Sequence, residues 1–188
     1  MKLLLASASP RRADLLRAAG FDFETTTVHV DESPRPGEPP ADYVRRLAAE
    51  KSLAAQARDR RGCPVLAADT TVVVDRQLLG KPRDEEEAAE MLRRLAGRRH
   101  DVLTGVSLRR GAVELGGVER TIVEFRPLRP DEVRWYVASG EWQDKAGGYA
   151  IQGLASRFVI RVDGSYSNVV GLPIALVDEL VHALASAG

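Results

Sequence analysis

The chain has 188 residues, of which 44% are hydrophobic and 29% charged, enough apolar side chains for one globular domain or a domain with two lobes. Its 27 basic residues balance its 27 acidic residues. This neutral balance argues against a protein that binds nucleic-acid polymers, because such proteins usually carry a basic excess. A pocket for a small anion needs only a few basic residues and stays compatible with the composition.

The single cysteine, Cys63, excludes an internal disulfide and a cysteine-based zinc site. The opening residues 1–6 faintly resemble a signal peptide, but Arg11 and Arg12 interrupt the apolar stretch too early. The longest later apolar run, Val169–Val177, is about half of the roughly 20 residues that a membrane span needs. We therefore expect a cytoplasmic protein without a membrane partner.

Strands and helices are expected to alternate along the chain. The first half predicts a strand at Leu3–Ala6, a helix from Pro10 to Ala19, an extended segment over Phe21–Val30, a proline-rich loop over residues 33–40, a helix from Ala41 to about Arg60 and a buried strand over Pro64–Val74. The second half predicts a helix from Asp84 to about Leu95, strands near Val102–Arg109 and Thr121–Phe125, a helix over Pro130–Ser139, a strand at Phe158–Val162 and a last helix from Pro173 to about Leu184.

Cap residues and short connections support these boundaries. Ser9 is expected to cap the helix that Pro10 opens, and Asp84 with Glu87 three residues later predicts a capping box. A glycine-rich connection is expected between the two middle strands. The pattern predicts an α/β fold with a mixed central sheet flanked by helices, in a single domain over residues 1–188.

Arg11 and Arg12 stand in the first turn of a helix, where cations oppose the helix dipole. A bound phosphate would reverse that effect, because free N–H groups, two guanidinium groups and the hydroxyls of Ser7 and Ser9 could converge on it. Alternatively, both arginines are surface residues that cost a few tenths of a kcal/mol. This feature alone leaves the two readings even.

Asp69 interrupts an otherwise apolar strand, Val65–Val74. A carboxylate there is costly unless it is paired or bound to a metal. The alternative is that two short strands meet at Asp69 and its side chain forms a turn hydrogen bond. The pattern favours a functional carboxylate.

Lys51 lies on the apolar stripe of its predicted helix, because it follows Val44 by seven positions and Leu47 by four. Its ammonium group could extend to the surface, as is common, or reach a buried anionic group. The helix pattern leaves both open.

Three further segments give weaker signals. Lys81 lies in a tight turn after the Asp69 strand, and the acidic pair Asp31-Glu32 is suited to Mg²⁺ at the start of a loop. Gln152 lies in a glycine-rich segment, Gly147–Gly153, where its amide could read the edge of a nucleobase. Each of these features is also common in ordinary solvent-exposed loops.

Five ordered blocks of the sequence resemble the Maf family of nucleotide pyrophosphatases. The blocks are Ser7-Ala8-Ser9-Pro10-Arg11-Arg12, Ala68-Asp69-Thr70, Gly80-Lys81-Pro82, the block over residues 144–153 and the block over residues 164–173. Together they span nearly the whole chain. The resemblance implies a fold similar to inosine-triphosphate pyrophosphatases, with a long mixed sheet, two lobes and a cleft.

The resemblance also implies an activity. It predicts hydrolysis of nucleoside triphosphates to the monophosphate and pyrophosphate with a divalent cation, Mg²⁺ or Mn²⁺. Ala68-Asp69-Thr70, together with Gln152, is similar to the dTTP/UTP group, whereas the 7-methyl-GTP group typically has Ser-Asp-Gln at the first of these positions. A cytoplasmic homodimer with dTTP and UTP as substrates is the expected form.

The family roles carry over onto matching residues. Asp69 matches the proton acceptor, and Arg11, Thr70 and Gln152 match positions linked to substrate choice. Glu32, Lys51 and Lys81 match other active-site positions. The proline-rich loop over residues 33–40 is less similar to the family. The role of Glu32, which precedes this loop, therefore has the weakest support from the resemblance.

From these residues we hypothesise a mechanism and a rival. Glu32 and Asp69 would hold the metal, and Asp69 would activate water for attack on the α-phosphorus. Lys51, Lys81 and the two arginines would neutralise the triphosphate. The rival is a nucleotide-binding regulator of septum formation or cell division without turnover. A house-cleaning pyrophosphatase for non-standard nucleotides, including a purine-selective one, would differ only at the base pocket.

Overall fold

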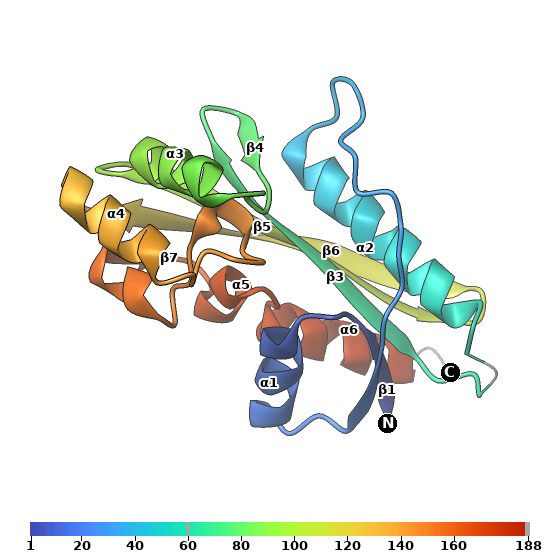
Figure 1. Cartoon of the computed structure of the whole chain (residues 1–188). Helices are drawn as coiled ribbons and strands as arrows, with labels where there is room; N and C mark the ends of the chain where they lie inside the picture. Colours follow the sequence, from blue (N-terminus) through green and yellow to red (C-terminus); the bar gives the residue numbers. More distant parts are fainter. Residues whose placement is uncertain (60, 187–188) are drawn as a thin grey trace. The chain divides into compact units, whose positions relative to one another are not determined.

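The computed structural model describes residues 1–59 and 61–186, which divide into two compact units. Unit 1 comprises Met1–Thr70, Thr104–Glu119 and Gly171–Gly188, and unit 2 comprises Thr71–Leu103 and Arg120–Val170. The strands form one mixed seven-stranded sheet in the order β2-β1-β3-β5-β6-β7, with β4 paired to β3. The predicted α/β class with helices around a mixed sheet is confirmed (Figure 1). The single-domain assignment stays a prediction.

Unit 1 contains the parallel part of the sheet. Strand β1 (Leu3–Ala6) pairs in parallel with β2 (Phe23–Thr26) on one side and with β3 (Val65–Val74) on the other. Its four side chains are all buried, as expected for a strand covered on both faces. Parallel pairing with β3 runs from Leu4↔Val65 to Ala6↔Ala67, so Asp69 lies just beyond the carboxyl end of β1.

Helices cover both faces of this part of the sheet. On one face, helices α1 (Pro10–Ala18) and α6 (Ile174–Ser186) pack through Leu16, Val177 and Leu184 against Leu3 and Leu5. The opposite face carries Leu4, Ala6, Val65 and Ala67, which pack against Ala55 of helix α2 (Pro40–Gln56). The strict alternation along β1 therefore sends successive leucines into two different cores.

Unit 2 is organised around aromatic side chains. Phe125 makes edge-to-face contacts with Tyr149, Phe158 and His100, with ring centroids 4.8, 6.1 and 5.0 Å away. Helix α3 (Glu85–Leu95) packs beside α4 (Pro130–Ala138), as Figure 1 shows. The remaining elements of this unit are β4 (Gln77–Leu79), β7 (Val159–Asp163), α5 (Tyr166–Val170) and two short 3₁₀ turns, η1 (Ala146–Gly148) and η2 (Leu154–Arg157).

The middle strands are longer than predicted. β5 (Arg99–Arg110) and β6 (Val113–Phe125) include most of the segment expected to be a glycine-rich connection. Gly116 explains the difference, because a Cβ there would lie 2.7 Å from the carbonyl oxygen of Val106. Glycine thus lets the two strand backbones approach closely, so it belongs to the strand and not to a loop.

Two predicted boundaries differ in detail. Helix α2 ends at Gln56, before the expected end near Arg60, which itself lies outside the described residues. The capping box of α3 is incomplete. Asp84 accepts the Glu87 N–H at 2.8 Å, but the Glu87 carboxylate accepts from the backbone N–H of Arg83 instead of that of Asp84. The Arg83 side chain also pairs with this carboxylate and draws it away from the cap.

Candidate active site

Asp69 is a buried carboxylate of unit 1. It lies on β3 with only 8% of its surface exposed, and its Oδ1 atom is 2.6 Å from the Lys51 ammonium nitrogen. The position just past the carboxyl end of a parallel strand is where open α/β sheets bind ligands. Of the two alternatives for Asp69, the structure shows a buried, paired carboxylate within one continuous strand.

Lys51 joins Asp69 to Glu32. Its side chain is 12% exposed, and its Nζ atom lies 2.6 Å from a carboxylate oxygen of each residue. Lys51 therefore reaches a buried anionic group instead of extending to the surface. Glu32 is 52% exposed at its side chain, so this ammonium connects an enclosed carboxylate with one that faces solvent.

Tyr43 is a residue of this site that the sequence analysis missed. Its hydroxyl donates to the backbone carbonyl of Glu32 at 2.9 Å. Burial, and then the charges of Asp69 and Glu32, raise the pKa of Tyr43 to about 12. A signal was available, because Tyr43 precedes Lys51 by eight positions and two helical turns bring such residues to one side of a helix.

The proline-rich loop after Glu32 is also attached to α2. Arg46 donates to the carbonyl of Ser33 at 3.2 Å and pairs with the Glu38 carboxylate at 2.6 Å. That pairing with Arg46 is the main cause that lowers the pKa of Glu38 to about 2. Helix α2 thus positions Lys51 directly and Glu32 through its loop.

Ser7 and Ser9 form a turn before α1. The Ser9 N–H donates to the Ser7 hydroxyl at 3.1 Å, and the Ser9 side chain makes no capping bond. Ser9 thus occupies the predicted N-cap position and Pro10 opens the helix, but the Ser9 hydroxyl does not supply the capping hydrogen bond. Arg11, at the start of α1, is partly buried.

The guanidinium group of Arg12 is enclosed by protein oxygens. Its Nε donates to the Gly171 carbonyl at 2.7 Å, and its other nitrogens donate to Ala68, Thr70 and Ser7. Burial lowers the pKa of Arg12, while the charge of Asp69 opposes that shift. Thr104 and Gly171, which sequence reasoning missed, complete these surroundings, since the Thr104 hydroxyl lies 2.9 Å from that of Thr70.

Lys81 and Gln152 belong to unit 2, where both are exposed. Their segments are joined by a hydrogen bond from the Gly147 N–H to the Gly80 carbonyl, 2.9 Å long. Gly147 adopts φ 69°, and a Cβ there would lie 2.8 Å from the Val72 side chain, so only glycine fits.

Two tyrosines hold the glycine-rich segment before Gln152. The Tyr149 hydroxyl bonds to the buried His100 ring at 2.8 Å, and the Tyr136 hydroxyl accepts the Ala150 N–H at 3.0 Å. Burial lowers the pKa of His100 to about 4. His100 is therefore neutral at physiological pH and serves as a packed hydrogen-bonding ring.

The predicted metal ligands fit a hard divalent cation in chemistry. Across residues 1–59 and 61–186, no group of three or more His, Cys, Asp or Glu side chains is arranged to hold a metal ion. Glu32 and Asp69 nevertheless place two carboxylates around one positive group, Lys51. Mg²⁺ commonly takes only one or two carboxylates and completes its shell with water and substrate phosphates.

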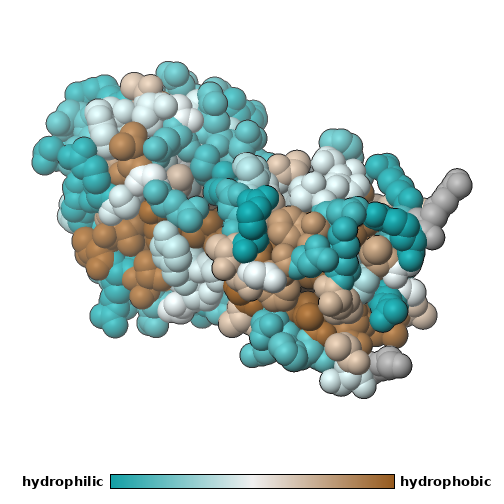
Figure 2. All heavy atoms as spheres, turned by 90° about the horizontal axis from the view of Figure 1, so that it is seen from below, coloured by the Kyte–Doolittle hydropathy of each residue, from teal (hydrophilic) through white to brown (hydrophobic). Residues whose placement is uncertain are grey.

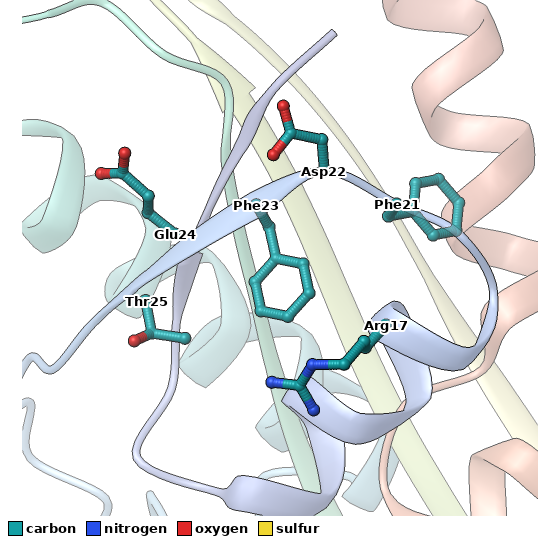
Figure 3. A pocket seen from close by; sticks show the side chains of 6 residues that line it. All are labelled: Arg17, Phe21, Asp22, Phe23, Glu24 and Thr25. Atoms are coloured by element: carbon teal, nitrogen blue, oxygen red, sulfur yellow. The ribbon is translucent and has the colours of Figure 1, made fainter.

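A pocket elsewhere in unit 1 is distinct from this charged cluster. It lies along the edge strand β2 and the end of α1, and Figure 3 shows its six lining residues, Arg17, Phe21, Asp22, Phe23, Glu24 and Thr25. The Arg17 guanidinium stands 5.9 Å from the centre of the Phe23 ring. None of the predicted site residues lines this pocket.

Known proteins resemble this chain over nearly its full length. A relative from Anaeromyxobacter sp. named dTTP/UTP pyrophosphatase is 52% identical over 186 residues, covering 96% of this chain and 88% of the relative. A relative of the same name from Methylococcus capsulatus is 50% identical over 184 residues, covering 98% of this chain and 91% of the relative.

A solved structure shares the fold. The Staphylococcus aureus Ham1 protein superposes with a TM-score of 0.52 at 13% identity, covering 100% of this chain and 99% of that one. The family model described as Maf-like protein matches residues 2–184. With this match and relatives about half identical in sequence, the chain belongs to the Maf family.

Proposed function

We propose that this chain hydrolyses dTTP and UTP to the monophosphate and pyrophosphate. The observation that carries the proposal is a buried Asp69 paired with Lys51, in a chain about half identical to proteins named dTTP/UTP pyrophosphatase. A protein that only binds phosphate gains nothing from a carboxylate at its site, because like charges repel. Asp69 therefore favours hydrolysis over the regulator without turnover.

The reaction needs one proton acceptor. Asp69 takes a proton from water, and the water oxygen forms a bond to the α-phosphorus. The bond between that phosphorus and the oxygen bridging to the β-phosphorus breaks, so pyrophosphate leaves with the bonding electrons. Lys51, 2.6 Å from Asp69, fixes the carboxylate and lies close to the charge that develops.

The other predicted residues neutralise the charge of the substrate and recognise its base. Arg11, Lys51 and Lys81 neutralise the triphosphate and the departing pyrophosphate, since charge stabilisation carries most of the catalysis in such transfers. Gln152 pairs with the O4 and N3–H groups of uracil or thymine, which a purine amine would not match. Exposure of Lys81 and Gln152 is consistent with contact to a ligand that comes from solvent.

A divalent cation, Mg²⁺ or Mn²⁺, belongs to the proposed function. Glu32 and Asp69 are the residues that would hold it, and when bound it would neutralise charge on the phosphates. Lys51 contacts both of these carboxylates, so its ammonium group and the cation would share the same negative charges.

The cellular setting completes the proposal. We place the enzyme in the cytoplasm, where its nucleotide substrates are dissolved and where a chain with a single cysteine needs no disulfide. No helix in residues 1–59 and 61–186 is long and apolar enough to cross a membrane. A homodimer is proposed from the resemblance to the family.

The test is pyrophosphate release from dTTP, UTP, CTP, GTP, 7-methyl-GTP and ITP, each with Mg²⁺, Mn²⁺ or EDTA. We expect metal-dependent release that favours dTTP and UTP, with activity lost in EDTA. Preference for a purine would retain the chemistry and overturn the base assignment. Tight nucleotide binding without release from any substrate would identify the regulator instead.

A further inference from the structure

The Arg12 side chain binds the strand on both sides of Asp69. One guanidinium nitrogen donates to the Ala68 carbonyl at 2.8 Å, and another donates to the Thr70 hydroxyl at 3.0 Å. These two residues are the immediate neighbours of Asp69 on β3. The planar guanidinium group is therefore bonded to the residue before and the residue after the proposed proton acceptor.

The same side chain ties this strand to two other segments of unit 1. Its Nε donates to the Gly171 carbonyl at 2.7 Å, and one terminal nitrogen also donates to the Ser7 hydroxyl at 3.3 Å. Arginine has five N–H groups. The four hydrogen bonds leave at most one of them for a phosphate, so the protein already uses most of the binding capacity of Arg12.

Thr70 is used by the protein in the same way. Its hydroxyl accepts from Arg12, donates to the Gly171 carbonyl at 3.3 Å and lies 2.9 Å from the Thr104 hydroxyl. One donor and two acceptor sites satisfy a hydroxyl completely. Thr70 therefore has little hydrogen-bonding capacity left for a substrate, although the family resemblance links its position to substrate choice.

We propose that Arg12, Thr70 and Thr104 form a clasp that positions Asp69 for attack on the α-phosphorus, and that Arg12 is a positioning residue instead of a phosphate ligand. This inference rests on the proposed pyrophosphatase function. It assigns the phosphate-binding role at the start of α1 to Arg11. Gly171 belongs to the clasp through its carbonyl, which accepts from both Arg12 and Thr70.

The geometry explains why arginine is needed. A lysine keeps the charge but presents one rotating ammonium group, which cannot reach Ala68, Thr70 and Gly171 together as a planar fork does. Loss of the clasp would let β3 shift around Asp69, and small displacements of a reacting group reduce the rate strongly. Substrate affinity would change little, because the lost bonds are made to protein.

The test compares Arg12→Lys and Thr104→Val with Arg17→Lys, a control on the same helix whose side chain is 67% exposed. For Arg12→Lys we expect kcat on dTTP to fall about ten- to a hundredfold, with KM within about threefold of wild type. The Kd of α,β-methylene-dUTP, measured by calorimetry, should likewise stay within about threefold of wild type. Thr104→Val, which removes one hydroxyl from the clasp, should lower kcat by about three- to tenfold. Arg17→Lys should match wild type.

Each outcome decides the proposal. If Arg12→Lys raises KM and the analogue Kd while kcat is kept, Arg12 contacts substrate and the clasp is wrong. If Arg12→Lys does not fold, Thr104→Val decides alone, and an unchanged kcat refutes the clasp. A wild-type protein without turnover would refute the proposed function separately. In that case faster amide hydrogen exchange at residues 68–70 in folded Arg12→Lys would still support the clasp, and unchanged exchange would refute it.

Discussion

At the scale of single residues, the site depends on how buried charges are compensated. Burial of an isolated carboxylate is unfavourable, so Asp69 requires the Lys51 ammonium beside it. The same ammonium contacts Glu32, whose exposed carboxylate needs no such compensation. Lys51 thus contacts one exposed carboxylate, Glu32, and one buried carboxylate, Asp69. The buried carboxylate is better suited to a fixed catalytic position.

Asp69→Asn is the first prediction at this scale. The amide keeps the shape of the side chain but cannot accept the proton from water, so turnover should fall at least about a hundredfold. Nucleotide binding should remain measurable by calorimetry, because the residues proposed to bind the phosphates are unchanged. Turnover close to wild type would show that Asp69 is not the proton acceptor.

Tyr43→Phe tests the support of Glu32. The variant loses the hydrogen bond from the phenol to the Glu32 carbonyl, worth about 1 kcal/mol, and keeps the ring. We expect pyrophosphate release to fall roughly fivefold, the factor that corresponds to this energy, in steady-state assays. A matching rise in the Mg²⁺ concentration that gives the half-maximal rate would link Tyr43 to the metal. An unchanged rate would mean that the loop keeps Glu32 in place by itself.

At the scale of elements, α2 determines where Lys51 lies. Its close approach to β5 depends on Gly105, because a Cβ at that position would stand 2.3 Å from the Val44 carbonyl. A buried hydrogen bond between the hydroxyls of Ser52 and Ser107, 2.8 Å long, also fixes the helix to the strand. The helix is therefore seated by backbone contact and by a polar bond at the residue next to Lys51.

Gly105→Ala should push α2 away from β5. We expect the free energy of unfolding to fall by about 1–3 kcal/mol, as for other overpacked cores, and kcat to fall with it because Lys51 moves. Gly117→Ala is the matched control on β6, since its Cβ would meet only the flexible end of the Leu176 side chain at 3.1 Å. Denaturant unfolding and pyrophosphate release measure both. Equal behaviour of the two variants would contradict the close-contact argument.

At the scale of the whole molecule, charge is balanced and the surface is mixed. The face in Figure 2 shows apolar side chains gathered in patches between hydrophilic ones. The large apolar side chains that are exposed include Leu53, Trp135, Ile160 and Tyr166. Because the formal net charge is zero, we look for the pH dependence of stability in individual buried polar groups, of which His100 is one.

The pH dependence of stability should reveal His100. Burial lowers its pKa from 6.5 to about 4, so between these values the unfolded chain binds a proton that the folded chain does not. Above pH 6.5 the ring is neutral in both states and the free energy of unfolding is unaffected by this residue. As the pH falls from 6.5 toward 4, protonation of the unfolded chain lowers the free energy of unfolding by at most about 3 kcal/mol. Urea unfolding at several pH values between about 4.5 and 7 measures the slope of the free energy of unfolding against pH. The variant His100→Gln should reduce this slope. An unchanged slope in His100→Gln would contradict this account.

The sequence by itself predicted most of the helices and strands, and it marked Asp69 and Lys51, the charged pair of the candidate site. Apolar periodicity located β1, β3 and α2, and it marked Asp69 and Lys51 because each breaks a local pattern that the chain must compensate. Motif order indicated the family. These signals are local, so they are readable without knowing which segments meet.

Only the tertiary structure showed which polar side chains already have their hydrogen bonds made to other parts of the protein. Arg12 bonds to acceptors 56 and 159 positions away, and both are backbone carbonyls that carry no side-chain signal. The Gly116 segment became strand for a similar reason, because its neighbour is the backbone of another strand. Backbone acceptors and close approaches arise only when distant segments pack, so residue type and spacing could mark Arg12 as unusual without assigning its partners.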